Sequence, residues 1–226
     1  MEPIPRILHR IWVGAEPLPA AAERFADSWT HHHPGWQMRL WTDASLPSHL
    51  VNREICEQTA HPAQRADVLR HEILNLFGGV YIDVDFECFR PIEPLLEGVG
   101  YFYGDEREGR AGTAILGCTP GHPFARWCLE RLPEHWPWTQ GSILEETGPV
   151  FFERAVASYA ADAAEEPLAD PLTGRHAGTR LMPPQRPPLH VFAPWVFFPY
   201  WCGETWRPED HTDSYAAHHW QKNWEF

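Results

Sequence analysis

Several features that would point directly to a functional class are scarce in this sequence of 226 residues, beginning with cysteine. The five cysteines are scattered and form no C-x-x-C pair: Cys56, Cys88, Cys118, Cys128 and Cys202. A zinc ribbon needs paired cysteines, and a disulfide scaffold needs a larger and even set, so neither is indicated. Unpaired cysteines fit a reducing compartment, and we expect a cytoplasmic protein.

Positive charge is also scarce. The chain has 18 Lys and Arg against 31 Asp and Glu, which gives a formal net charge of -13. A protein that neutralises a phosphate backbone needs a basic stripe, and the sequence contains no such run. We therefore expect no nucleic-acid partner, and anionic membrane surfaces are disfavoured for the same reason.

Long apolar runs are missing as well. No segment approaches the roughly 20 apolar residues that cross a bilayer, so we expect no transmembrane segment. The N-terminal sequence MEPIPRILHRIWVG carries prolines and charges where a signal peptide has an uninterrupted apolar core. The composition is 43% hydrophobic and 22% charged, and together with the length it predicts a single globular domain over residues 1–226.

Strand-like and helix-like segments alternate in the first half of the chain. Strands are predicted at 6–13, 36–41, 80–86 and 113–116, and helices at 20–30, 61–77, 124–132 and 149–161. Beyond residue 161 the pattern weakens into Pro- and Gly-rich loops. The alternation predicts a three-layer α/β domain with a mostly parallel central sheet.

Two carboxylates lie two residues apart in the most strand-like segment, GGVYIDVDF at 78–86. A period of two places Tyr81, Asp83 and Asp85 on one face of that strand. Two partly buried carboxylates repel each other, and a divalent cation such as Mg²⁺ or Mn²⁺ relieves the repulsion. The alternative is a solvated strand face. The carboxyl end of a central strand is, however, where open α/β sheets bind ligands.

A second group of charges lies just upstream, in RADVLR at 65–70. Asp67 and Arg70 are three residues apart, so they share one face of the predicted helix. They are placed either to hydrogen-bond a polyol or to form a structural ion pair with each other. The same helix runs directly into the strand that carries the two aspartates.

These segments resemble a known family. The sequences IPRILHRIW, PGWQMRLWTD, RADVLRHEILNLFGGVYIDVDFECFRPI, PGHPF, TGP and AHHWQKNW are similar in order and spacing to the DXD sugar-binding glycosyltransferases of family 32. That family includes fungal initiating mannosyltransferases and the glucosylating domains of bacterial toxins. The resemblance spans nearly the whole chain, and its long central motif is the most specific part.

The resemblance implies a GT-A fold and a metal-dependent retaining transfer of a hexose from a UDP- or GDP-linked donor to an acceptor hydroxyl. Carried over residue by residue, it makes Asp85 a direct ligand of Mn²⁺ or Mg²⁺ and shares Asp83 between the metal and the donor. Asp67 and Arg70 match positions that grip the hydroxyls of the donor sugar. Trp12 matches an aromatic residue that packs near the nucleotide, with a core tryptophan as the alternative.

Tyr81 is placed by the same motif either against the nucleotide or in the core. The resemblance also indicates a third metal ligand near the C-terminus, at the histidine that directly precedes an aromatic residue. This favours His219 over His218, and strand alternation lets only one of the two face the site. Relatives carry a small residue and a glycine before the last tryptophan of this motif, whereas this chain has Gln221, Lys222 and Asn223 before Trp224.

Two other functions share single features with this chain. A phosphatase of the haloacid dehalogenase type also ends a strand in D-x-D, but there the motif usually opens the chain and a later acidic motif completes the site. A non-catalytic carbohydrate-binding protein would use some of the twelve tryptophans to stack on sugars. The identities of the donor sugar and of the acceptor are not readable from the motifs.

Overall fold

The computed structural model describes residues 2–135 and 142–221. Its strands are β1 Ile7–Ile11, β2 Gln37–Trp41, β3 Gly79–Ile82, β4 Phe86–Cys88, β5 Tyr101–Asp105, β6 Ala111–Cys118, β7 Ala164–Ala169, β8 His176–Met182, β9 Leu189–Phe192 and β10 Ala216–His218. Its α-helices are α1 Ala20–His32, α2 Arg53–Gln58, α3 Pro62–Phe77, α4 Pro123–Arg131, α5 Ile143–Glu146, α6 Pro149–Tyr159 and α7 Pro194–Phe197. Short 3₁₀ helices lie at Glu93–Leu96, Leu132–His135 and Pro208–Asp210.

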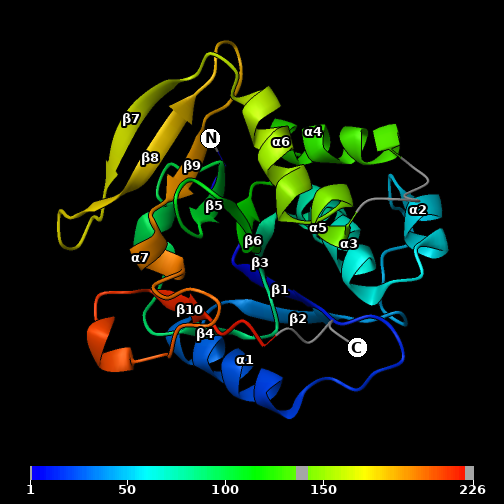
Figure 1. Cartoon of the computed structure of the whole chain (residues 1–226), viewed down its shortest axis with the longest axis horizontal. Helices are drawn as coiled ribbons and strands as arrows, with labels where there is room; N and C mark the ends of the chain where they lie inside the picture. Colours follow the sequence, from blue (N-terminus) through cyan, green and yellow to red (C-terminus); the bar gives the residue numbers. More distant parts are fainter. Residues whose placement is uncertain (1, 136–141, 222–226) are drawn as a thin grey trace.

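Eight of the described strands form one sheet in the order β2-β1-β3-β6-β5-β9-β8-β7 (Figure 1). β1 pairs in parallel with β2 and β3, and β5 pairs in parallel with β9. β6 and β8 are antiparallel to both of their neighbours. Six strands therefore run in one direction and two run against them, which confirms the predicted α/β class and the mostly parallel sheet.

Helices and loops cover both faces of the sheet, as a three-layer arrangement requires. One buried cluster joins the sheet to α3, α4 and α6, and a second joins it to α1 and α7. Alternation along β5 shows the division: Tyr101 and Tyr103 belong to the first cluster and Phe102 to the second. The sheet thus forms the middle layer of the fold, and its edges carry the connecting loops.

The junction between α3 and β3 determines how the predicted site residues meet. Pro62 occupies the first turn of α3, and two glycines of positive φ end the helix, Gly78 at 60° and Gly79 at 91°. A Cβ atom at Gly79 would lie 2.6 Å from the carbonyl oxygen of Ile7 on the neighbouring strand. Only glycine allows so tight a turn, and it carries the chain from the helix directly into β3 beside β1.

The predicted strand at 80–86 is two strands, and the prediction of one continuous strand is wrong. β3 ends at Ile82, and residues 83–85 form a turn, closed by a 3.2 Å hydrogen bond from the Phe86 amide to the Asp83 carbonyl. β4 then pairs with β10 in a separate two-stranded sheet. Alternating apolar residues continue through the turn, so the sequence pattern did not reveal it.

Three strands beyond residue 161 were not predicted. β7, β8 and β9 extend the sheet beyond β5, where Pro- and Gly-rich loops were expected. The β7 sequence AEEPLA is mostly exposed and contains residues that are poor strand formers, so its pairing with β8 carries no sequence signal. Among the described residues, no helix is both long and apolar enough to cross a membrane.

Candidate functional site

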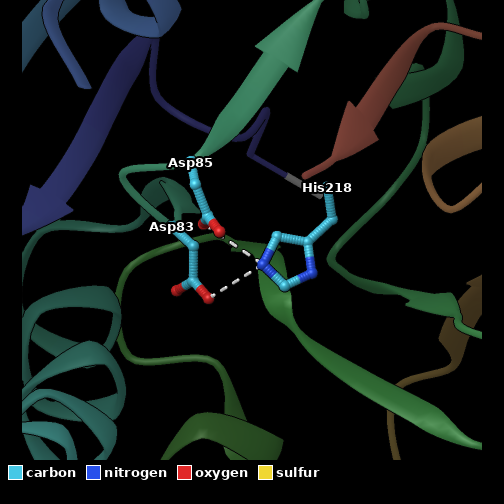
Figure 2. A group of neighbouring side chains, drawn as sticks. All are labelled: Asp83, Asp85 and His218. Carbon is cyan, nitrogen blue, oxygen red and sulfur yellow. Dashed lines mark hydrogen bonds and ion pairs between the residues drawn. The ribbon is translucent and has the colours of Figure 1, made fainter. Parts of the chain in front are cut away.

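The two aspartates of the D-x-D motif lie in the turn after β3, and β10 brings a histidine to them (Figure 2). His218 Nε2 lies 3.2 Å from Asp85 Oδ1 and 3.7 Å from Asp83 Oδ2. One possible ligand atom from each of the three residues lies within 4.8 Å of the others. The three side chains therefore converge on one small volume at the carboxyl edge of the sheet.

The structure places His218, and not the predicted His219, beside the aspartates. β10 pairs antiparallel with β4, with His218 opposite Phe86, and consecutive side chains leave a strand on opposite sides. His219 turns away: its Nε2 lies 2.7 Å from Glu87 Oε2, and its ring stacks on Phe25 at 4.8 Å. The expectation that only one histidine faces the site agrees with this geometry, but the preference for His219 is corrected.

Electrostatics at the three residues favours a positive charge between the carboxylates. Burial alone would lower the pKa of His218, but Asp85 and Asp83 outweigh it, and the pKa is raised. Burial raises the pKa of Asp83 despite Arg70 and His218 nearby. Asp85 is buried too, yet His218 and the backbone amide of Gln221, 2.8 Å away, hold the pKa of this carboxyl below its ordinary value.

The donor set fits a divalent cation. Two carboxylates and one imidazole suit Mn²⁺, whereas Mg²⁺ prefers oxygen ligands alone. Phe86 stacks on the His218 ring at 5.6 Å and holds it in place, while the buried Nδ1 of the ring has no hydrogen-bond partner among the described residues. Nε2 of His218 thus faces the two carboxylates, and the three side chains present the donor atoms that a cation would need.

Asp67 and Arg70 form a buried ion pair on α3, which was one of the two predicted arrangements. Arg70 Nη2 donates to Asp67 Oδ1, and Arg70 Nη1 donates to the Thr113 carbonyl at 2.7 Å. The second carboxylate oxygen of Asp67 accepts from Thr147 Oγ1 at 2.8 Å. Burial raises the pKa of Asp67, although Arg70 and Thr147 oppose that shift. The pair is thus held from β6 and from the residue that directly follows α5.

Tyr81 connects this pair to the D-x-D turn. Its ring lies under the Arg70 guanidinium at 4.9 Å, and its hydroxyl donates to Asp83 Oδ1 at 2.5 Å. The side chain is 2% exposed, so its contacts in the structure are those of a packing residue that fixes Asp83. Sequence reasoning pointed to Asp67, Arg70, Tyr81 and Asp83, and the structure brings all four into one network.

Trp12 lies at the carboxyl end of β1, on the same edge of the sheet as Asp83. It is partly exposed and is absent from both buried clusters, which argues against a core tryptophan. Its indole Nε1 donates to the Glu16 carbonyl at 2.7 Å. Thr147 and the Gln221 amide were not predicted as site residues, because Thr147 lies 80 residues beyond Asp67, just after α5, and Gln221 acts through its backbone. Lys222, Asn223 and Trp224 of the C-terminal motif lie outside the described residues.

The chain resembles known glycosyltransferases in sequence and in fold. Residues 19–99 match the family model described as "Glycosyltransferase sugar-binding region containing DXD motif". The chain is 27% identical to inositol phosphoceramide mannosyltransferase 1 of Schizosaccharomyces pombe, over 93% of this chain and 64% of that protein. It is 26% identical to mannosyl phosphorylinositol ceramide synthase SUR1 of Saccharomyces cerevisiae, over 92% of this chain and 53% of that protein. The chain thus spans less than two thirds of these relatives.

Solved structures resemble the fold. The PaToxG glycosyltransferase superposes with a TM-score of 0.55 at 16% identity and covers 70% of each chain. A glycosyltransferase involved in the glycosylation of the major capsid of PBCV-1 gives a TM-score of 0.50 at 13% identity, over 95% of this chain and 93% of that one. The fold is the GT-A fold of glycosyltransferases. Within that class, the resemblance to the DXD glycosyltransferases is confirmed by the match of the sugar-binding region.

Proposed function

We propose that this protein transfers a hexose from a nucleotide-diphospho-sugar to an acceptor hydroxyl, with a divalent cation and with retention at the anomeric carbon. The observation that carries the proposal is the convergence of Asp83, Asp85 and His218 at the carboxyl edge of the sheet. The DXD sugar-binding region and the curated relatives named as mannosyltransferases support it.

In this proposal Asp83, Asp85 and His218 hold Mn²⁺, with Mg²⁺ as a weaker substitute. When bound, the ion supplies positive charge that stabilises the departing diphosphate. The other contribution of the protein is to position the three side chains that would hold the ion. Tyr81 fixes Asp83, the Gln221 amide fixes Asp85, and the two carboxylates keep His218 aimed at the same point.

The sugar of the donor lies, in this proposal, over Asp67 and Arg70. Polar atoms held rigidly by Thr113 and Thr147 bind hydroxyls without the entropy loss of ordering free side chains. Trp12, partly exposed at the same edge, packs near the nucleotide base. The attacking hydroxyl approaches beside the leaving phosphate, and a phosphate oxygen receives its proton.

The donor is the next point to establish. Because the curated relatives are named for mannosyl transfer, GDP-mannose is the first sugar nucleotide to test, followed by other GDP- and UDP-sugars. The experiment is a screen for release of nucleoside diphosphate by the purified protein with Mn²⁺, with Mg²⁺ and with EDTA. We expect turnover of at least one donor with Mn²⁺ and none with EDTA. Release at the same rate in EDTA would contradict the proposed metal dependence.

A further inference from the structure

A further carboxylate lies at the same edge of the sheet as the D-x-D turn. β3 and β5 are both antiparallel to β6, so their carboxyl ends lie on one side. Asp83 follows β3, and Glu106 follows β5 directly. The turn from 106 to 110 is closed by a hydrogen bond of 2.9 Å from the Glu106 amide to the Arg110 carbonyl. The fold thus delivers Glu106 to the catalytic edge of the sheet.

The stem of the Glu106 side chain packs over Gly112. A Cβ atom added at Gly112 would lie 2.8 Å from Cγ of Glu106 and 2.8 Å from the Phe198 ring. The missing side chain at Gly112 therefore makes the room in which the stem of Glu106 packs beside Phe198. The Phe198 ring meets the His218 ring edge-on, with 6.1 Å between the ring centroids. Glu106 and His218 therefore pack beside the same aromatic ring.

The Glu106 carboxylate has no hydrogen bond or ion pair within residues 2–135 and 142–221, although the turn offers two arginines. Arg107 pairs with Glu204 at 3.0 Å, and both Arg107 and Arg110 lie over the Trp201 ring, at 5.8 and 5.6 Å. Burial raises the pKa of Glu106 to about 7; His218 opposes the shift, and Asp83 and Glu153 add to it. The side chain is partly buried, so its carboxylate is less fully hydrated than that of a free glutamate.

Two ordinary explanations for such a group do not apply. The three-residue group with convergent ligand atoms consists of Asp83, Asp85 and His218, so Glu106 lies outside the set that holds a cation. It is also not part of the Asp67–Arg70 network, whose hydrogen bonds go to Thr113 and Thr147. What remains is a partly buried hydrogen-bond acceptor at the sheet edge that carries the D-x-D turn, near enough to His218 and Asp83 for their charges to shift its pKa, and unused by the described part of the protein.

We propose that Glu106 is a catalytic residue that accepts a hydrogen bond from the hydroxyl attacking the anomeric carbon. The inference rests on the proposed function and adds a residue to it. In the transfer step the hydroxyl oxygen bonds to the anomeric carbon while the bond from that carbon to the diphosphate oxygen breaks. The electron pair of the broken bond leaves with the diphosphate, and the hydroxyl proton ends on a phosphate oxygen. Glu106 orients the hydroxyl and is unchanged afterwards.

The test uses water as the attacking hydroxyl, so no acceptor has to be known. Hydrolysis of GDP-mannose, or of another sugar nucleotide that the wild type hydrolyses, is measured with Mn²⁺ for the wild type and for Glu106→Gln. The glutamine keeps the length and shape of the side chain but is a weaker, neutral acceptor. We expect kcat to fall at least tenfold, with the KM for the donor and the Mn²⁺ concentration for half-activation within twofold of wild type.

Two more variants make the result specific. Glu108→Gln removes the same charge from the same turn at an exposed position and should behave as wild type. Glu106→Asp keeps the charge on a stem shorter by one methylene and should recover part of kcat, and it decides the question if the glutamine variant fails to fold.

Three results would overturn the assignment. These are an unchanged kcat for Glu106→Gln, a raised KM at unchanged kcat, and a shifted Mn²⁺ requirement. The second would make Glu106 a donor-binding residue, and the third would make it part of the cation site. A wild type that hydrolyses none of the screened donors would instead count against the proposed function itself, and that result is visible before any variant is made.

Discussion

Neighbouring histidines at the end of β10 differ in role because a strand sends consecutive side chains to opposite sides. His218 contacts both aspartates, whereas His219 is held by Glu87, Tyr200 and the Phe25 ring. The sequence motif identified the pair but not the member, because the register of β10 on β4 decides which ring faces the turn. The aromatic residue that follows His219 therefore did not predict which histidine contacts the aspartates, whereas the register of β10 on β4 does.

The first prediction compares the two histidines as alanine variants. His218→Ala removes the imidazole from the group with Asp83 and Asp85, so the Mn²⁺ concentration for half-activation should rise at least tenfold and the preference for Mn²⁺ over Mg²⁺ should shrink. His219→Ala should leave the Mn²⁺ activation curve within about threefold of wild type. The measurement is turnover against metal concentration for both variants. A defect confined to His219→Ala would return the ligand role to the residue predicted from sequence.

A second prediction at this scale concerns Asp67, for which the structure shows an ion pair and the proposal adds contact with sugar. Asp67→Asn leaves the buried Arg70 without its charged partner, and we expect a loss of about 3 kcal/mol in the free energy of unfolding. We also expect kcat/KM for the donor to fall at least a hundredfold, measured where the variant is fully folded. Retained kcat/KM in the folded variant would mean that the pair only supports the structure.

The junction of α3 and β3 shows what each element contributes to the site. The helix supplies Asp67 and Arg70, the strand supplies Tyr81 and ends at Ile82, directly before Asp83, and two glycines join helix and strand without a loop. The helix and its stop signal could be predicted from sequence because Pro62, the apolar period and Gly78-Gly79 all act locally. The turn at 83–85 could not, because it depends on pairing between β4 and β10, which are more than a hundred residues apart.

The same reasoning explains the missed strands. β7 to β9 gain their pairing from β5 and from one another, and the residues of β7 have little strand preference of their own. Glu106 was equally hidden: in the sequence it is one of several charges in a turn. Only the fold brings Glu106 and His218 beside the same Phe198 ring. Local signals therefore predicted the α/β class and five residues of the site, Asp67, Arg70, Tyr81, Asp83 and Asp85. The choice of His218 over His219 and the placement of Glu106 depend on long-range strand pairing.

The third prediction tests the junction. Gly79→Ala places a methyl group 2.6 Å from the Ile7 carbonyl oxygen at a φ of 91°, so either the turn or the β1–β3 pairing must shift. We expect a loss of at least about 2 kcal/mol in the free energy of unfolding, measured by urea denaturation. Gly35→Ala is the matched control, since nothing lies within 4 Å of its added Cβ, and its effect should stay within about 1 kcal/mol.

On the scale of the whole molecule, the balance of buried titratable groups makes stability depend on pH. Burial lowers the pKa of His71 to about 3 and that of His9, His122 and His190 to about 4. The unfolded chain therefore binds more protons at these histidines below pH 6.5, and their effect is to reduce the free energy of unfolding as the pH falls towards 4. Buried carboxyls with raised pKa, such as Asp83, act in the opposite direction.

The fourth prediction isolates one of these histidines by difference. The His71 ring stacks on Phe152 at 5.9 Å, and neither of its nitrogens has a hydrogen-bond partner among the described residues. His71→Phe keeps an aromatic ring there and removes the titration. As the pH falls from 6 to 4, the difference in the free energy of unfolding between the variant and the wild type should grow in favour of the variant. The growth should be up to about 1.4 kcal/mol for each pH unit. The exposed His49, changed to Phe, should follow the wild-type curve, and parallel curves for His71→Phe would contradict the account.

The central claim is that Asp83, Asp85 and His218 form one cation site at the carboxyl edge of a GT-A sheet. The most direct measurement is a titration of Mn²⁺ into the protein with GDP or UDP present, with the free ion followed by electron paramagnetic resonance. The account predicts one Mn²⁺ bound per chain in the wild type, and binding at least tenfold weaker in Asp85→Asn. Equal Mn²⁺ binding by the wild type and Asp85→Asn would contradict it.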